Sequence, residues 1–152
     1  MISWDDLTEE QKLLCAGIDP ERAEDGPHGQ ARLRLPGRRT CDTIEVDHIW
    51  SPATSQEIVE PLLLSIGRHE DGRIGEVFID GREIGRGKVA QRTTALRQDV
   101  AVLISIALQY GAPIEVLRGA VSRAELNVMG KARIVPQTIV GTVLDALAGE
   151  QG

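Results

Sequence analysis

The chain has 152 residues, the size of one domain, and its 3% aromatic content requires a core of aliphatic side chains. Its net charge of -6 disfavours binding to long nucleic acid or to an anionic membrane, because both need a basic surface. Cys15 and Cys41 form no CxxC pair and lack zinc-type spacing to histidine. We therefore expect reduced structural thiols and no metal site.

The N-terminal residues predict a short helix over 8–17, in which Thr8 and Gln11 form a capping box and Gly17 ends the helix. Residues 19–38 combine proline, glycine and charge with few apolar side chains, which is typical of a flexible linker. We therefore expect a helical appendage over 1–18, joined by the linker and docked on its own subunit or on a neighbour.

No segment of the sequence has the hydropathy pattern of a signal peptide or of a membrane-spanning helix. The first residues lack the basic start and apolar stretch of a signal peptide. The longest apolar run, over 100–108, is shorter than the roughly 20 residues that span a bilayer. We expect a soluble, cytoplasmic protein.

Two predicted strands follow the linker. Residues 40–50 alternate, with Ile44, Val46, His48 and Trp50 on one face, and a second strand runs over about 58–69, where Pro61 indicates an edge or a bulge.

A hairpin links the second strand to a third. Asp71-Gly72 predicts a two-residue type I′ turn. That turn pairs Glu70 with Arg73, and one face of the hairpin is then apolar: Leu62, Leu64, Ile66, Val77 and Ile79, with Leu64 opposite Ile79 and Ile66 opposite Val77.

The C-terminal half predicts helices. Residues 93–111 form the strongest one, capped by Thr93 or Thr94 and closed by Gly111, and we expect Ser105 to bond the backbone of its own helix. Its second half is apolar nearly all round, so the helix is either central in the fold or in contact with another subunit, and we expect a homo-oligomer that forms through it.

Two further helices are expected after this one. Pro113 begins a helix to about Val121, residues 124–135 are irregular or form a short strand, and Pro136 begins a last helix that Gly149 follows. Strands followed by helices define an α+β domain over 39–149, with an antiparallel sheet built around the hairpin and packed against the C-terminal helices.

The segment after the hairpin, GREIGRGKVAQR, is basic in an otherwise acidic chain. Glycines beside a helix N-terminus can bind phosphate, although a solvated loop explains the same composition. A P-loop would need Gly at position 82 and Ser or Thr at position 89, where Arg82 and Val89 stand. A dinucleotide fingerprint needs a parallel sheet, and the surrounding pattern is antiparallel.

Catalytic chemistry lacks a sequence signature. The three histidines share no helical spacing, and Asp47 and His48 point to opposite faces of one strand. We therefore expect no enzymatic activity and no cofactor.

Three stretches together resemble a known family: EDGRIGEVFID, RQDVAVLISIALQYGAPIEVLRGAV, and Arg123 leading into IVGTVLDAL. They are similar to the TSCPD domain, which forms the C-terminal part of many adenosylcobalamin-dependent ribonucleotide reductases and also occurs as small stand-alone bacterial and phage proteins. The resemblance covers about residues 38–147. The motif that names the family is reduced to Thr40-Cys41-Asp42, and an Arg-rich loop replaces the usual Lys-x-Gly-Ser segment.

The resemblance implies a nucleotide-related setting without reductase activity, because the reductase cysteines and barrel do not fit in this chain. We expect a non-catalytic, oligomeric module that binds a nucleotide or another phosphate-bearing ligand, as an accessory or regulator of nucleotide metabolism that could partner a ribonucleotide reductase.

Two alternatives stay open: a phage-type sponge that sequesters a nucleotide-derived cyclic immune signal without turnover, and, less favoured, a nucleotide-processing enzyme. The candidate ligand residues are basic or aromatic: Arg82, Arg86, Lys88, Arg92, Arg97, Phe78 and Tyr110.

Overall fold

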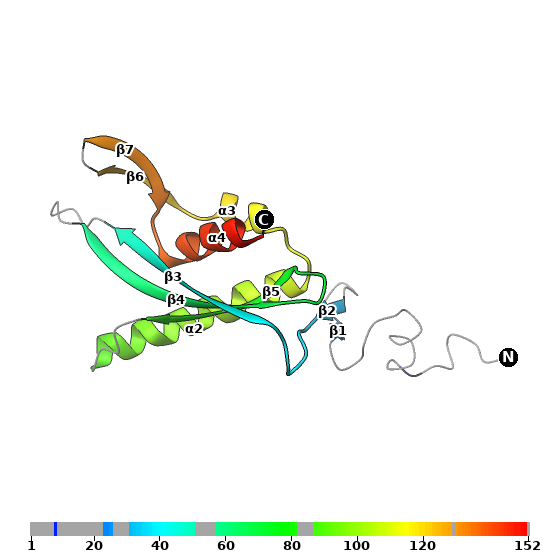
Figure 1. The fold of residues 1–152 in the computed structure, drawn as a ribbon. Coiled ribbons are helices and arrows are strands. Elements are labelled where there is room, and N and C mark those ends of the chain that lie inside the picture. The colour runs from blue at the N-terminus through cyan, green and yellow to red at the C-terminus, as the bar shows by residue number, and fades with distance from the viewer. Residues whose placement is uncertain are drawn as a thin grey trace.

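The computed structural model describes Thr8 and residues 23–25, 31–50, 57–81, 87–128 and 130–151. Figure 1 shows the arrangement of its elements. In chain order they are β1 (Ala23–Asp25), β2 (Ala31–Leu33), β3 (Cys41–Trp50), β4 (Ile58–Arg68), β5 (Ile74–Gly81), α2 (Lys88–Gln109), α3 (Ile114–Ala120), β6 (Arg123–Val128), β7 (Lys131–Pro136) and α4 (Ile139–Glu150).

The centre of the fold is an antiparallel sheet in the order β3-β4-β5. The predicted register of the hairpin is confirmed, since Leu64 lies opposite Ile79 and Ile66 opposite Val77. The predicted apolar face is buried and meets side chains of α2, α3 and α4 in one core. The α+β class, with a hairpin-based sheet against C-terminal helices, is therefore confirmed.

The turn of the hairpin differs from the predicted two-residue type I′ turn. The His69 N–H donates to the Arg73 carbonyl at 2.8 Å, and the Gly72 N–H donates to the His69 carbonyl at 2.9 Å. Three residues thus form the loop, and Gly72 has φ 88. The ladder shifts by one residue at Gly67/Arg68, which restores the predicted register further along.

Pro61 lies in the central strand, opposite Asp47 of β3. Among the described residues, pairing of β4 with β5 begins at Leu62, opposite Gly81. The missing N–H of Pro61 therefore interrupts no described pair of the β4–β5 ladder.

Helix α2 begins at Lys88, five residues before the predicted cap at Thr93, and Gly87 with φ 126 is its N-cap. Its end agrees with the prediction, because Gly111 follows with φ 86. In Figure 1, α2 runs along β5 below the strands of the sheet. Helix α4 lies above these strands in the same view and contacts β3.

The region after α3 was predicted as irregular or a short strand, and it forms the antiparallel hairpin β6–β7. Pro136 ends β7 and does not begin the last helix, which starts after Thr138 and includes Gly149. The hairpin projects away from the sheet (Figure 1).

The predicted linker contains structure, because β1 and β2 pair with each other in antiparallel register. The helix predicted over 8–17 lies outside the described residues except for Thr8. Within the described ranges, no helix is both long and apolar enough to cross a membrane.

A candidate ligand groove between β5 and α2

Strand β5 is an edge of the sheet, and α2 lies along that edge. The Ser105 hydroxyl accepts a hydrogen bond from the Val77 N–H at 2.9 Å and donates to the Val77 carbonyl at 3.3 Å. This corrects the prediction that Ser105 bonds its own helix. One turn further on, Gln109 Nε2 donates to the Gly75 carbonyl at 3.0 Å. Side chains of the helix thus satisfy edge groups that another strand would otherwise pair.

Gly75 of β5 allows the side chains of Leu35 and His69 to lie close to the strand backbone. A Cβ built on Gly75 would overlap the side chain of Leu35 and lie 2.5 Å from His69 Nε2. The bulge and the missing side chain of Gly75 together allow the segment that follows β2 to pack against the first residues of β5.

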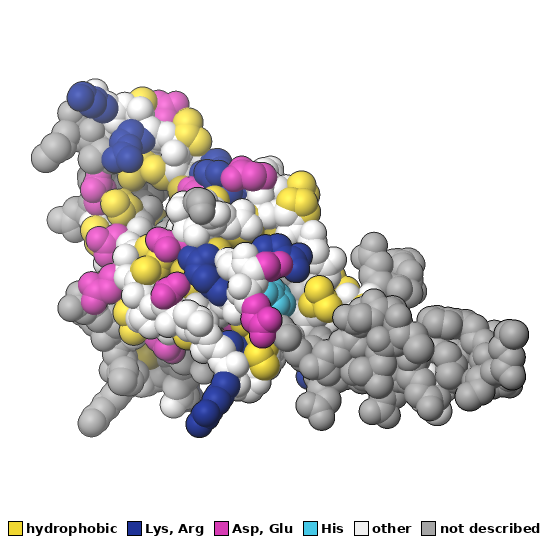
Figure 2. All heavy atoms as spheres, turned by 45° about the vertical axis from the view of Figure 1, so that its right-hand side comes forward, with side chains coloured by type: hydrophobic (Ala, Val, Ile, Leu, Met, Phe, Trp, Pro, Cys, Tyr) yellow, Lys and Arg dark blue, Asp and Glu magenta, His cyan; other side chains and the backbone are white. Residues whose placement is uncertain are grey.

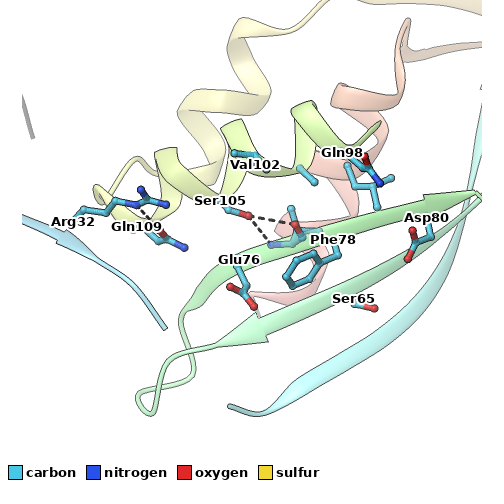
Figure 3. Close-up of a pocket in the computed structure, with 12 residues that line it drawn as sticks. Arg32, Ser65, Glu76, Phe78, Asp80, Gln98, Val102, Ser105 and Gln109 are labelled. Atoms are coloured by element: carbon cyan, nitrogen blue, oxygen red, sulfur yellow. Dashed lines mark hydrogen bonds between the residues drawn. The ribbon is translucent and has the colours of Figure 1, made fainter. Parts of the chain in front are cut away.

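A groove of about 580 Å³ opens between β5 and α2. Figure 3 shows Phe78 on β5 between Glu76 and Asp80, with Gln98 on α2 above Asp80 and Arg32 near the opposite end. Phe78 is 48% exposed although it is the only phenylalanine of the chain. The groove therefore presents an aromatic surface to any planar group that enters it.

The charges around the aromatic ring differ in how they are compensated. Glu76 is paired with Arg39, and Arg32 Nε donates to Gln109 Oε1 at 2.7 Å. Asp80 forms no ion pair or side-chain hydrogen bond in the part of the chain that the structure describes. The groove thus offers a carboxylate to hydroxyl or amino groups at one end and a guanidinium at the other.

Of the predicted ligand residues, Phe78 lines this groove, whereas Arg82 and Arg86 lie outside the described residues. Lys88 and Arg92 are exposed on the first turns of α2. No acidic residue occupies the first turn of that helix, so its positive N-terminal dipole is not offset there.

Arg97 was predicted as a ligand residue, but its charge is already compensated within the fold. Its guanidinium is paired with Glu60 and its side chain is only 11% exposed. Its Nε is buried without a hydrogen-bond partner. The Glu60 carboxylate compensates the charge, so Arg97 holds the helix on the sheet and contributes little to an anion site.

Tyr110 lies at the other end of α2, about 33 Å from Lys88 at 1.5 Å per residue. It lines a separate pocket of about 290 Å³ with His69 and Arg73. The two predicted aromatic surfaces therefore belong to different sites.

Among the described residues, Phe78 is the one predicted ligand residue in this groove, and four of its polar residues, Arg32, Asp80, Gln98 and Gln109, were not predicted as ligand residues. Alternation in ARLRL could have indicated strand β2, but nothing local indicated that it would lie beside α2. The described residues hold no group of three or more His, Cys, Asp or Glu side chains arranged for a metal ion.

Comparisons of the chain with protein-family models, with curated proteins and with solved structures returned no match. The resemblance to the TSCPD domain thus depends on the sequence blocks quoted above.

Proposed function

We propose that the chain is a non-catalytic, oligomeric module that binds a nucleotide or a related phosphate-bearing ligand, in an accessory or regulatory role in nucleotide metabolism. The observation that carries this proposal is the exposed Phe78 ring inside a groove that has a free carboxylate at one end. Stacking of a base on an aromatic side chain contributes about 1–3 kcal/mol and tolerates any base.

The polar groups fit a nucleoside placed over Phe78. The unpaired Asp80 can accept hydrogen bonds from ribose hydroxyls, and the Gln98 amide can both donate to and accept from a base edge. These two side chains lie on opposite walls of the groove, so a nucleoside could contact both at once.

The phosphates would point toward the N-terminus of α2. Arg92 precedes Gln98 by six residues, or about 9 Å along the helix axis. Lys88 lies one turn earlier, and residues 82–86 connect the end of β5 to this turn. The proposal therefore keeps Arg82, Arg86, Lys88 and Arg92 as the phosphate-binding set and leaves Arg97 out of it.

Oligomerisation would use the outer face of α2. Leu96 and Leu103, seven residues apart and so on one face, are 59% and 67% exposed on a helix whose other side packs on the sheet. Apolar side chains in such a row are covered in many proteins by a second subunit.

The first test is a thermal-shift screen with mononucleotides, dinucleotides and cyclic nucleotides. A ligand at 100 times its Kd should add about 2.7 kcal/mol of stability. We expect the Phe78→Ala chain to lose the shift while its unliganded melting temperature stays within error. Val59→Ala is the matched control, because Val59 is 52% exposed and does not line the groove.

The fate of the ligand separates the roles. Recovery of the unchanged ligand after heat denaturation, with dissociation slower than the assay, would favour the sponge. Rapid exchange, together with an effect on a co-purifying reductase, would favour the accessory role. Recovery of a chemically altered ligand would contradict a non-catalytic module. A thermal shift that persists in the Phe78→Ala chain would contradict ligand binding in the groove.

A further inference from the structure

The outer edge of β3 is a second candidate interaction site. The sheet order β3-β4-β5 leaves β3 with one strand neighbour among the described residues. The strand is 10 residues long, which is long for an edge without a partner. An exposed edge of this length can accept a further strand through its backbone groups.

A groove of about 370 Å³ lies beside this edge. Val46, Asp47 and Ile49 of β3 form one wall, and Thr142, Asp145 and Ala146 of α4 face them. Val135 and Pro136 of β7 line it as well. A strand added to β3 would therefore have an apolar groove for its side chains.

Charge disfavours the pairing of two β3 strands in the registers centred on Val46 or Asp47. In a two-fold antiparallel pair centred on Val46, Glu45 faces Asp47 of the other strand, and a pair centred on Asp47 places this residue opposite itself. Like charges opposite each other destabilise a ladder. A strand that carries basic residues would instead face Glu45 and Asp47 with the opposite charge.

The chain contains such a strand in β7. Lys131 and Arg133 lie on one face of it and have no ion-pair or hydrogen-bond partner in the described residues, while Ile134 on the other face is 65% exposed. β7 pairs only with β6 there, and a two-stranded ribbon is marginally stable by itself. Figure 2 shows basic side chains at the top of the molecule, where the hairpin projects, and acidic side chains below them.

We propose that the β3 edge of one copy binds the β6–β7 hairpin of a second copy through β7. In the antiparallel direction, Lys131 opposite Asp47 brings Arg133 opposite Glu45. In the parallel direction, Lys131 lies opposite Glu45 and Arg133 opposite Asp47. In both directions the apolar face of β7, with Ile134, joins the face of β3 that carries Ile44 and Val46. Charge and hydropathy thus match on the two faces together.

This contact joins two different surfaces, so it is head-to-tail and builds a closed ring or a longer array. It does not involve the α2 face or the ligand groove. Either proposal can therefore fail without the other.

The test measures molar mass by light scattering over a range of concentrations. It uses the full chain with Leu96→Ser and Leu103→Ser, which makes the exposed α2 face polar and isolates the β3 contact. We expect association in this background, and we expect Asp47→Lys to weaken it at least about tenfold. Lys131→Glu with Arg133→Glu should weaken it further, and combining this pair with both Glu45→Lys and Asp47→Lys, so that every facing pair again carries opposite charges, should restore it.

Glu70→Lys, in the exposed hairpin turn, is the control for the charge change and should leave the mass unaltered. A monomeric background chain at every concentration would overturn the proposal, as would an unchanged mass with Asp47→Lys. Failure of the combined charge changes to restore association would overturn it too. Loss of association on deletion of residues 1–30 alone would assign the edge to that segment and also overturn it.

Discussion

The hydroxyl of Ser105 on α2 bonds both backbone polar groups of Val77 on β5, at 2.9 and 3.3 Å. One side chain thus fixes the helix against the free edge of the sheet. Because Phe78 and Gln98 occupy the two elements that this contact joins, it also sets the width of the groove.

We expect Ser105→Ala to lower the free energy of unfolding by about 1–3 kcal/mol, because the buried Val77 N–H would lose its partner. Denaturant unfolding measures this change, and the slope should stay constant. Ser122→Ala at an exposed position is the control. An equal, negligible effect of both substitutions would mean that the helix is held on β5 by apolar packing alone.

Glu60→Gln should destabilise the chain by about 1–3 kcal/mol, since it leaves the mostly buried Arg97 guanidinium without a compensating charge. Adding Arg97→Met to Glu60→Gln removes that charge and should recover part of the loss, which a double-mutant cycle measures. If Glu60→Gln unfolds at the wild-type denaturant concentration, then the pair contributes nothing and Arg97 is free to serve the anion site.

Acidification should destabilise the fold through His48. Burial lowers the pKa of His48 from 6.5, and nearby Glu60 opposes this shift. His48 is 4% exposed, and its Nδ1 lies 2.8 Å from Thr142 Oγ1. Glu60 lies opposite His48 in the ladder and is itself paired with Arg97. Because the unfolded chain takes up the proton first, stability is complete above pH 6.5 and falls as the pH drops through the lowered pKa.

The measurement is unfolding free energy between about pH 8 and about pH 5 for the wild type and His48→Gln. We expect the wild-type slope in the acidic half of this range to flatten in the variant, even if the variant is less stable throughout. Parallel slopes would show that other groups carry the pH dependence.

Local periodicity was sufficient to predict the central hairpin. Alternation in β4 and β5 fixed the pairing of Leu64 with Ile79, because a slip by one residue would expose the whole apolar face. The turn was mispredicted, since Asp71-Gly72 fits two loop lengths and the bulge at Gly67/Arg68 depends on contacts of Gly75 distant in the sequence.

The site was predicted only in part, because its contacts join residues that are distant in the sequence. Phe78 follows from the strand pattern, but the pairing of Arg97 with Glu60 joins residues 37 positions apart. The contact of Arg32 with Gln109 spans 77 positions. Composition showed that basic residues cluster after the hairpin and could not show which of them a carboxylate would neutralise.

The most direct test of the ligand proposal is a crystal structure with the nucleotide that gives the largest thermal shift. We expect the base ring within about 4 Å of the Phe78 ring, with a ribose hydroxyl bonded to Asp80 and the phosphates toward Lys88 and Arg92. A nucleotide bound in the pocket of Tyr110, or anywhere without contact to Phe78, would contradict it.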